Sequence, residues 1–186
     1  MLDAADRLRT PTGTRSSGFT LIELMIGITI LAIVLAAGLP SFSQWIHNSR
    51  IRTAAESITH GMQKARAEAV SRNTTIAFVL GNGTFWSILQ GATVIESMPS
   101  AETASTISVT SVPTPPATNS PTTITFSGMG IVIPNTDGTA SITQVDVDST
   151  AISSADSRDL RIVVAAGGAV RMCDPNVVST SDPRKC

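Results

Sequence analysis

A single acidic residue, Glu23, lies near the start of a long apolar run. Between Phe19 and Ile46, no other residue is charged. A charge at the centre of a bilayer costs about 2.5–3.5 kcal/mol on insertion scales, so acids in such segments are rare and are usually functional. The sequence therefore marks Glu23 as a candidate for a charge-pairing role.

Two cysteines, Cys173 and Cys186, both fall within the last 14 residues. An even pair at one terminus favours a disulfide bond, which requires an oxidising compartment such as a bacterial periplasm. A zinc site is the weaker alternative, because two thiols with no histidine nearby supply too few ligands.

Residues suited to catalysis are sparse. His47 and His60 lie among polar neighbours, and we expect both to be exposed. The sequence contains no HExxH, CxxC, GxSxG or Walker pattern, so neither an enzyme nor a cofactor is predicted. Asp146, Asp148 and Asp156 have oxygen ligands for a cation but lack EF-hand spacing, so no metal site is predicted. An anchored enzyme of an unusual type stays open as an alternative, because a fold does not fix a function.

The apolar run is long enough to cross a membrane. Phe19 to Ile46 comprises 28 residues, which exceeds a hydrocarbon core of about 30 Å at about 1.5 Å per residue. Small residues at 16–18 precede this region, whereas the cleavage site of a secretory signal follows it. Cleavage after Gly18 would leave a chain that begins with a membrane helix. Arginines on both sides of the run do not settle its orientation.

An amphipathic helix is predicted to follow Pro40 and to end near Asn73. Apolar residues recur there at intervals of mostly three or four, which places them on one face of a helix. These residues are Phe42, Ile46, Ala54, Ile58, Met62, Ala65 and Ala69. A half-apolar helix needs a partner surface, and we expect this stripe to belong to the core.

The rest of the chain reads as strands. Residues 74–80 and 85–90 flank the sequence GNGT, which is typical of a β-hairpin turn. Further strand patterns cover 122–134, 138–148 and 158–173. The fold class is therefore predicted to be α+β, with one long helix packed against an antiparallel sheet.

One segment, residues 99–122, interrupts the strand pattern. Sixteen of its 24 residues are Ser, Thr or Pro, a composition that favours a long loop or an edge insertion. O-glycans occur on some stretches of this kind, but a plain mobile loop is the preferred interpretation.

The sequence from Gly18 to Glu23, GFTLIE, followed by the apolar run, resembles the class III signal of type IV prepilins and type II secretion pseudopilins. The resemblance implies that a prepilin peptidase cuts after Gly18 and methylates the new N-terminus at Phe19. It implies a leader at 1–18, a membrane-spanning and filament-core helix at 19–45, and a periplasmic pilin-like head at 46–186. It also implies a single-pass protein of the bacterial inner membrane.

The same resemblance gives Glu23 a role in assembly. Leader removal would create a charged amine on Phe19, and Glu23 would pair with that amine on a neighbouring subunit. A buried ion pair is better suited to fixing the register of packed helices than to adding net stability. The implied partners are other minor and major pilins, the prepilin peptidase and the assembly platform in the inner membrane.

Two further segments narrow the resemblance to the FimT/FimU/GspH family of minor pilins and pseudopilins. They are TFSGMG at 125–130 and LRIVVAAGGAVRMC at 160–173. The Cys173–Cys186 tail favours the pilus side, because pilins commonly close a C-terminal loop with one disulfide. The predicted function is a minor pilin that helps to initiate a type IV pilus in a tip complex. The main alternative is a GspH pseudopilin of a type II secretion system.

The other alternative is DNA capture for natural transformation. DNA-binding relatives carry Gly-Arg-x-Arg in the last strand, whereas Gly168 is followed here by Ala-Val and then Arg171. A DNA site would use Arg171, Arg184 and Lys185. Three of the 13 Lys/Arg and two of the 14 Asp/Glu precede Phe19, so the mature chain has a formal net charge of −2. That balance opposes long-range attraction to phosphate, and DNA binding is the less favoured function.

Overall fold

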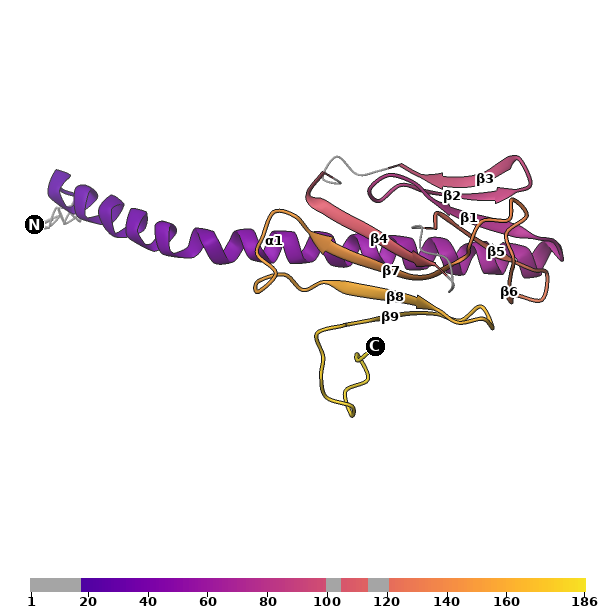
Figure 1. The fold of residues 1–186 in the computed structure, drawn as a ribbon. Coiled ribbons are helices and arrows are strands. Elements are labelled where there is room, and N and C mark those ends of the chain that lie inside the picture. The colour runs from indigo at the N-terminus through magenta and orange to yellow at the C-terminus, as the bar shows by residue number, and fades with distance from the viewer. Residues whose placement is uncertain (1–17, 100–104, 114–120) are drawn as a thin grey trace, which may run out of the picture. The chain divides into compact units, whose positions relative to one another are not determined.

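The computed structural model describes residues 18–99, 105–113 and 121–186. Within these residues, one helix is followed by nine strands in two antiparallel sheets (Figure 1), which confirms the predicted α+β class. The chain divides into two compact units, one up to Pro40 and one from Ser41 to Cys186. The predicted boundary between the membrane-spanning helix and the head, at residues 45 and 46, stays a prediction.

The helix α1 (Leu21–Arg72) belongs to both units, and Pro40 lies within it. Its C-terminal end is a Schellman motif. Asn73 has a φ of 48°, its amide donates to the Val70 carbonyl over 3.2 Å, and the Thr74 amide donates to the Ala69 carbonyl over 3.1 Å. Asparagine tolerates this left-handed conformation better than most residues, so Asn73 ends the helix where the sequence predicted.

The first unit exposes its apolar side chains. The large apolar residues between Phe19 and Leu35 are all more than half exposed. By length and hydropathy, no single helix of the described chain qualifies as a membrane span, whereas Leu21–Ala36 and Ser41–Arg72 qualify as a broken pair.

The second unit contains both sheets. The first sheet has the strand order β3-β2-β1-β5-β6 and the second has the order β4-β7-β8-β9, with every pairing antiparallel. The first sheet consists of β1 (Ile76–Leu80), β2 (Trp86–Gln90), β3 (Thr93–Met98), β5 (Thr123–Phe126) and β6 (Val132–Ile133). The second consists of β4 (Ile107–Pro113), β7 (Ile142–Ser149), β8 (Leu160–Val164) and β9 (Val170–Cys173).

The predicted hairpin between the first two strands is confirmed. Leu80 of β1 pairs with Trp86 of β2, and the turn between them contains Gly83 at a φ of 63°. A positive φ is cheap for glycine because it has no Cβ. The GNGT sequence therefore supplies the backbone conformation that this turn requires.

The core forms where the second half of α1 packs against both sheets. The predicted helical stripe is buried at Ala54, Ile58, Met62, Ala65 and Ala69, and the core also includes Ile51 and Ala55. Phe42, which was predicted to belong to the stripe, is instead exposed.

Contact between α1 and the first sheet is close at Gly61. A Cβ at this position would lie 2.8 Å from the Phe78 ring and 2.9 Å from the Trp86 ring. The Trp86 indole N–H donates to the Ser57 hydroxyl over 3.0 Å, which satisfies its one polar atom.

Two further sequence expectations need correction. Residues 107–113, within the stretch interpreted as a loop, form the edge strand β4, so the edge-insertion alternative holds there. Residues 100–104 and 114–120 of that stretch lie outside the described residues. His47 is not exposed: it is half-buried, and among the described residues its Nδ1 has no hydrogen-bond partner. His60 is exposed as expected.

Candidate functional site

The predicted cleavage residues lie just outside the first helical turn. Gly18, Phe19 and Thr20 precede α1 and have no regular secondary structure. The side chain of Phe19 is 89% exposed. A peptidase needs an accessible, non-helical backbone at the bond that it cuts, and the described residues on both sides of the Gly18–Phe19 bond have that form.

Thr20 and Glu23 form a capping box at the start of α1. The Glu23 amide donates to the Thr20 hydroxyl over 3.2 Å, and the Thr20 amide donates back to the Glu23 carboxylate over 3.3 Å. The Thr20 hydroxyl also donates to that carboxylate over 3.3 Å. This reciprocal arrangement satisfies two backbone donors that an unpaired helix start would leave free. Thr-x-x-Glu before an apolar run is the sequence signature of this cap, which the expectations from sequence did not include.

The capping box also fixes where the negative charge of Glu23 lies. The carboxylate is held at the N-terminal turn of α1, where the helix dipole is positive. Glu23 is exposed and is surrounded by exposed apolar neighbours such as Ile22 and Leu24. A cation that approached this turn would meet a pre-positioned carboxylate on an otherwise apolar surface.

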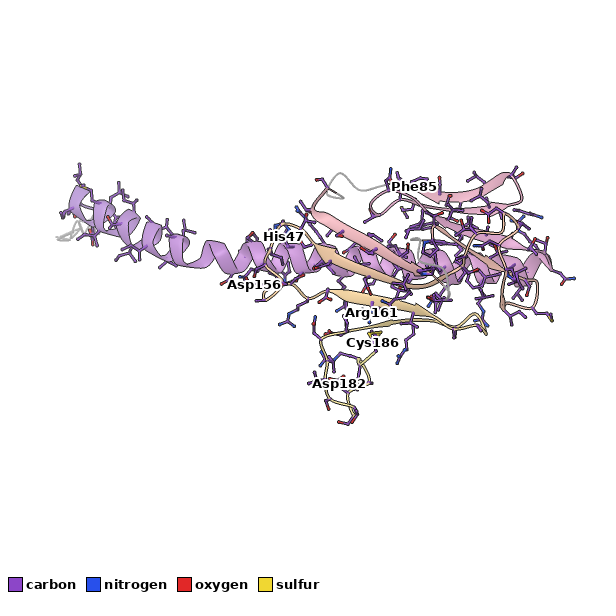
Figure 2. All side chains as sticks on the ribbon, in the orientation of Figure 1. His47, Phe85, Asp156, Arg161, Asp182 and Cys186 are labelled. Carbon is purple, nitrogen blue, oxygen red and sulfur yellow. A yellow bond between two sulfur atoms is a disulfide. The ribbon has the colours of Figure 1, made fainter. Side chains whose placement is uncertain are left out.

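The C-terminal tail forms a closed loop after β9. Cys173 and Cys186 form the predicted disulfide, with their Cα atoms 5.1 Å apart. Figure 2 shows this loop, with Asp182 and Cys186 labelled. The Asp174 amide donates to the Arg184 carbonyl over 2.7 Å, so backbone hydrogen bonding supports the covalent closure.

Two basic residues in this loop already have intramolecular partners. The Arg184 guanidinium makes two hydrogen bonds to the Asp182 carboxylate, at 3.1 and 2.8 Å. These bonds lower the pKa of Asp182 to about 2. The Lys185 ammonium donates to the Val178 carbonyl over 3.2 Å.

The three residues of the predicted DNA site are therefore not equivalent. Arg171 is exposed on β9, whereas Arg184 and Lys185 lie in the disulfide loop and use their side chains to hold that loop together. Of these three residues, Arg171 alone has a charged group without a hydrogen bond or ion pair to the described residues.

The acids that had been considered for a cation are occupied by other groups. Asp146 on β7 forms a two-bond ion pair with Arg161 on β8, at 2.7 and 3.2 Å. Asp148 accepts from the Ser157 hydroxyl, and Asp156 accepts from the Ser153 hydroxyl over 2.8 Å. Figure 2 labels Arg161 on β8 and Asp156 in the loop between β7 and β8.

The described part of the chain has no group of three or more His, Cys, Asp or Glu side chains that could hold a metal ion.

The two C-terminal segments that carried the family resemblance meet in the structure. Gly130, in the turn between β5 and β6, lies against Gly168, in the turn between β8 and β9. A Cβ on Gly168 would lie 1.9 Å from the Gly130 carbonyl oxygen. Arg66 of α1 donates to that same oxygen over 2.9 Å, a contact that sequence patterns did not indicate.

The family described as "Type II transport protein GspH" matches residues 54–168, which cover most of the head. The chain belongs to the GspH family. The pattern described as "Prokaryotic N-terminal methylation motif" matches residues 13–39, a range that contains Gly18, Phe19 and Glu23. No curated protein matches the sequence.

The fold is similar to solved structures of the type IV minor pilin FimU from Pseudomonas aeruginosa strain PAO1. One crystal form has a TM-score of 0.52 at 18% identity, and the alignment covers 72% of this chain and 95% of that one. A second crystal form gives a TM-score of 0.49 at 18% identity, covering 70% and 98%. At this identity, the first similarity establishes the pilin-like fold.

Membership of the GspH family fixes the general class of this protein. It is a pilin-type structural subunit with the N-terminal motif of membrane-anchored pilins. Proteins of this class are processed by a peptidase at that motif and assemble with other pilin-type subunits. The predicted family, which includes minor pilins and GspH pseudopilins, is confirmed.

Proposed function

We propose that this protein is a minor pilin of a type IV pilus and that it helps to initiate assembly in a tip complex. It would be a structural and assembly component and not an enzyme. Its partners would be other minor and major pilins, the prepilin peptidase and the assembly platform of the inner membrane.

The proposed maturation starts at the Gly18–Phe19 bond. The peptidase would remove the leader at 1–18 and methylate the amine of Phe19. The exposed, non-helical segment from Gly18 to Thr20 supports access to this bond. The product would begin one residue before the capping box, so its new positive charge would lie next to the first turn of α1.

The exposed apolar face of the first unit supports insertion in a membrane and later packing in a filament. A contiguous apolar surface of this length is not stable in water and needs lipid or another helix. Residues 19–45 would span the inner membrane once, and residues 46–186 would form a periplasmic head. The disulfide between Cys173 and Cys186 supports an oxidising compartment for the head.

The closed C-terminal loop is the observation that carries the choice of a pilus. Pilins commonly close a loop at this position with one disulfide, as the sequence resemblance implied. The fold similarity to FimU, a type IV minor pilin by its description, supports the same choice. The GspH match favours the second candidate, a pseudopilin of a type II secretion system.

A deletion of the gene in its own host distinguishes these two candidates. For a minor pilin, we expect far fewer surface pili by electron microscopy and normal levels of secreted proteins in the medium. The wild-type gene should restore the pili, and a gene encoding Glu23→Ala should restore them poorly. Loss of secretion with normal pilus numbers would instead assign the chain to a secretion pseudopilus.

A further inference from the structure

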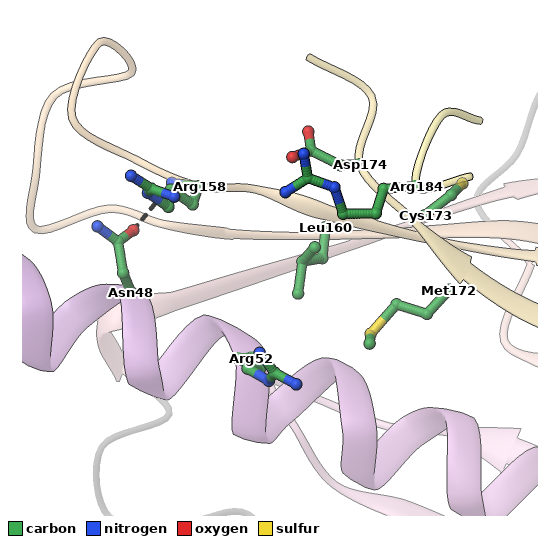
Figure 3. Close-up of a pocket in the computed structure, with 8 residues that line it drawn as sticks. All are labelled: Asn48, Arg52, Arg158, Leu160, Met172, Cys173, Asp174 and Arg184. Carbon is green, nitrogen blue, oxygen red and sulfur yellow. Dashed lines mark hydrogen bonds between the residues drawn. The ribbon is translucent and has the colours of Figure 1, made fainter. Parts of the chain in front are cut away.

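A cleft of about 330 Å³ lies where α1, the start of β8 and the C-terminal loop meet. Figure 3 shows its lining, which is Asn48, Arg52, Arg158, Leu160, Met172, Cys173, Asp174 and Arg184. Three of these side chains are arginines, and they come from three segments that are distant in sequence. Aliphatic and sulfur-containing side chains, Leu160 and Met172, supply its apolar surface.

Asn48 builds one end of the cleft by joining the helix to the chain that enters β8. Its side-chain amide donates to the Asp156 carbonyl over 3.0 Å, and its side-chain oxygen accepts from the Arg158 amide over 2.8 Å. Two hydrogen bonds from one asparagine fix the backbone of Arg158 against α1, as the dashed line in Figure 3 marks for the second bond. The Arg158 side chain therefore projects from a backbone that is held in place.

The three arginines differ in how their charge is balanced. Arg184 is held by Asp182 and also interacts with Asp174, so its charge is compensated within the loop. Arg52 pairs with Glu56 at 2.8 Å, but both side chains are exposed, and such pairs contribute little free energy. An incoming carboxylate can therefore replace Glu56 at small cost.

Arg158 has no such partner. Across the described residues, its guanidinium forms no hydrogen bond or ion pair, although acids flank it in sequence. Asp156 accepts from Ser153, and Asp159 accepts from Asn176. One guanidinium without a partner thus lies at the rim of a cleft whose lining is partly apolar.

We propose that this cleft binds an acidic segment of a neighbouring pilin-type subunit. A glutamate or aspartate side chain of that segment would pair with Arg158 and Arg52, and an adjacent apolar side chain would cover Leu160 and Met172. Guanidinium groups bind carboxylates through two parallel hydrogen bonds, which gives such a contact a defined geometry. This inference rests on the proposed function, since it describes how the subunit contacts its neighbours.

A protein segment fits this cleft better than a nucleic acid. Nucleic-acid binding requires several cations along a phosphate chain. An acid next to such a cation weakens its attraction to phosphate. Here Asp174 lines the cleft and Asp182 neutralises Arg184. Positive charge available to a ligand therefore remains only at the end lined by Arg52 and Arg158. One carboxylate next to an apolar group needs no more than that.

The test uses the full chain in detergent and fluorescence anisotropy with a defined probe. The probe is a short labelled peptide in which glutamates are separated by leucines, and its matched control has glutamine in place of glutamate. We expect the glutamate peptide to bind and the glutamine peptide to bind about tenfold more weakly, as for loss of one charge-assisted contact. Binding should weaken as salt is raised, because the contact is at the surface.

Substitutions then locate the site. Arg158→Gln should lower the affinity for the glutamate peptide about tenfold. Arg52→Gln should lower it by a smaller factor, because Arg52 already has a partner. Arg72→Gln is the matched control: Arg72 is exposed at the far end of α1 and should leave the affinity unchanged. Thermal unfolding of each variant confirms that the fold is intact.

Three results would overturn the inference. They are equal binding of both peptides, unchanged affinity in both cleft variants, and displacement of the peptide by duplex DNA at similar concentrations with the same dependence on Arg158. The last result would assign the cleft to phosphate. Because the assay contains no pilus, normal pilus assembly with no peptide binding would reject the cleft and leave the proposed function standing.

Discussion

Thr20 and Glu23 bind each other reciprocally at the first turn of α1, through hydrogen bonds of 3.2 and 3.3 Å between side chain and backbone. Glu23 therefore has a structural task in the single chain, in addition to the charge pairing proposed for the assembled filament. The two tasks are compatible, because the cap orients the carboxylate that a neighbour's amine would approach. They can be separated, because glutamine also serves at this capping position but carries no charge.

Comparison of Glu23→Gln with Glu23→Ala tests which task assembly needs. If the charge pairs with a neighbouring amine, both variants should enter pili at least about tenfold less than wild type, since breaking a buried ion pair costs about 3–5 kcal/mol. Quantitative immunoblotting of sheared pili, normalised to the amount in the membrane, measures this. Normal incorporation of the glutamine variant with failure of the alanine variant would show that capping is the only requirement.

Processing should depend on the small size of residue 18. A peptidase that accommodates glycine before the cut has no room for a branched side chain, so Gly18→Val should retain the 18-residue leader. Mass spectrometry of the membrane fraction should find wild-type protein that begins at methylated Phe19. Gly27→Val is a suitable control, since Gly27 is also a glycine of this unit but lies beyond the cut and has open space around it. An intact leader in the wild-type protein would contradict the proposed maturation.

The sequence predicted the helix, most of its buried stripe and the hairpin of β1 and β2, because these depend on local periodicity and on turn residues. It did not predict β3 or β4. The side chains of β3 are exposed or half-buried and do not alternate, and β4 lies in a stretch rich in Ser, Thr and Pro whose composition favoured a loop. Both are edge strands, and pairing with a neighbouring strand decides their structure more than their own composition.

The candidate site was only partly predictable for a similar reason. Glu23 and the cysteine pair can be recognised from the sequence, because an acid within an apolar run and two cysteines near one terminus are both unusual. The cleft could not be predicted, since Arg52, Arg158 and Arg184 meet only after two sheets and a helix have packed. His47 was wrongly expected to be exposed because its sequence neighbours are polar, whereas tertiary packing half-buries it.

The disulfide should stabilise the head. A closed loop of about 15 residues contributes about 3 kcal/mol through the entropy of the unfolded chain. Replacing both Cys173 and Cys186 by alanine should lower the free energy of unfolding by about that amount in denaturant titrations. Thiol labelling of the native wild-type protein should modify neither cysteine, and ready labelling of both would contradict the bond.

Gly168 should be irreplaceable for a steric reason. It has a φ of 78°, and a Cβ there would lie 1.9 Å from the Gly130 carbonyl oxygen, so Gly168→Ala must displace one of two turns. We expect a loss of stability of about 2 kcal/mol or more, from backbone strain and from the disturbed hydrogen bond of Arg66. Thermal and urea unfolding of the full chain measure it.

The adjacent Gly167 provides the control for that substitution. A Cβ at Gly167 meets no atom within 4 Å, so Gly167→Ala should change stability by less than about 0.5 kcal/mol. Equal effects of the two substitutions would mean that the contact between Gly130 and Gly168 is not what restricts this turn.

The full chain should bind duplex DNA only weakly, with a dissociation constant of about 10⁻⁴ M or weaker at physiological salt. The chain from Phe19 onward has a net formal charge of −2, and two of the three candidate cations, Arg184 and Lys185, already hold the disulfide loop. A gel-shift titration in detergent at two salt concentrations measures both the affinity and its salt dependence. Arg171→Ala should have little effect on the affinity for DNA, because one exposed guanidinium neutralises a single phosphate. Micromolar binding that is lost in Arg171→Ala or Arg184→Ala would reverse the order of the proposed functions and make DNA capture the leading one.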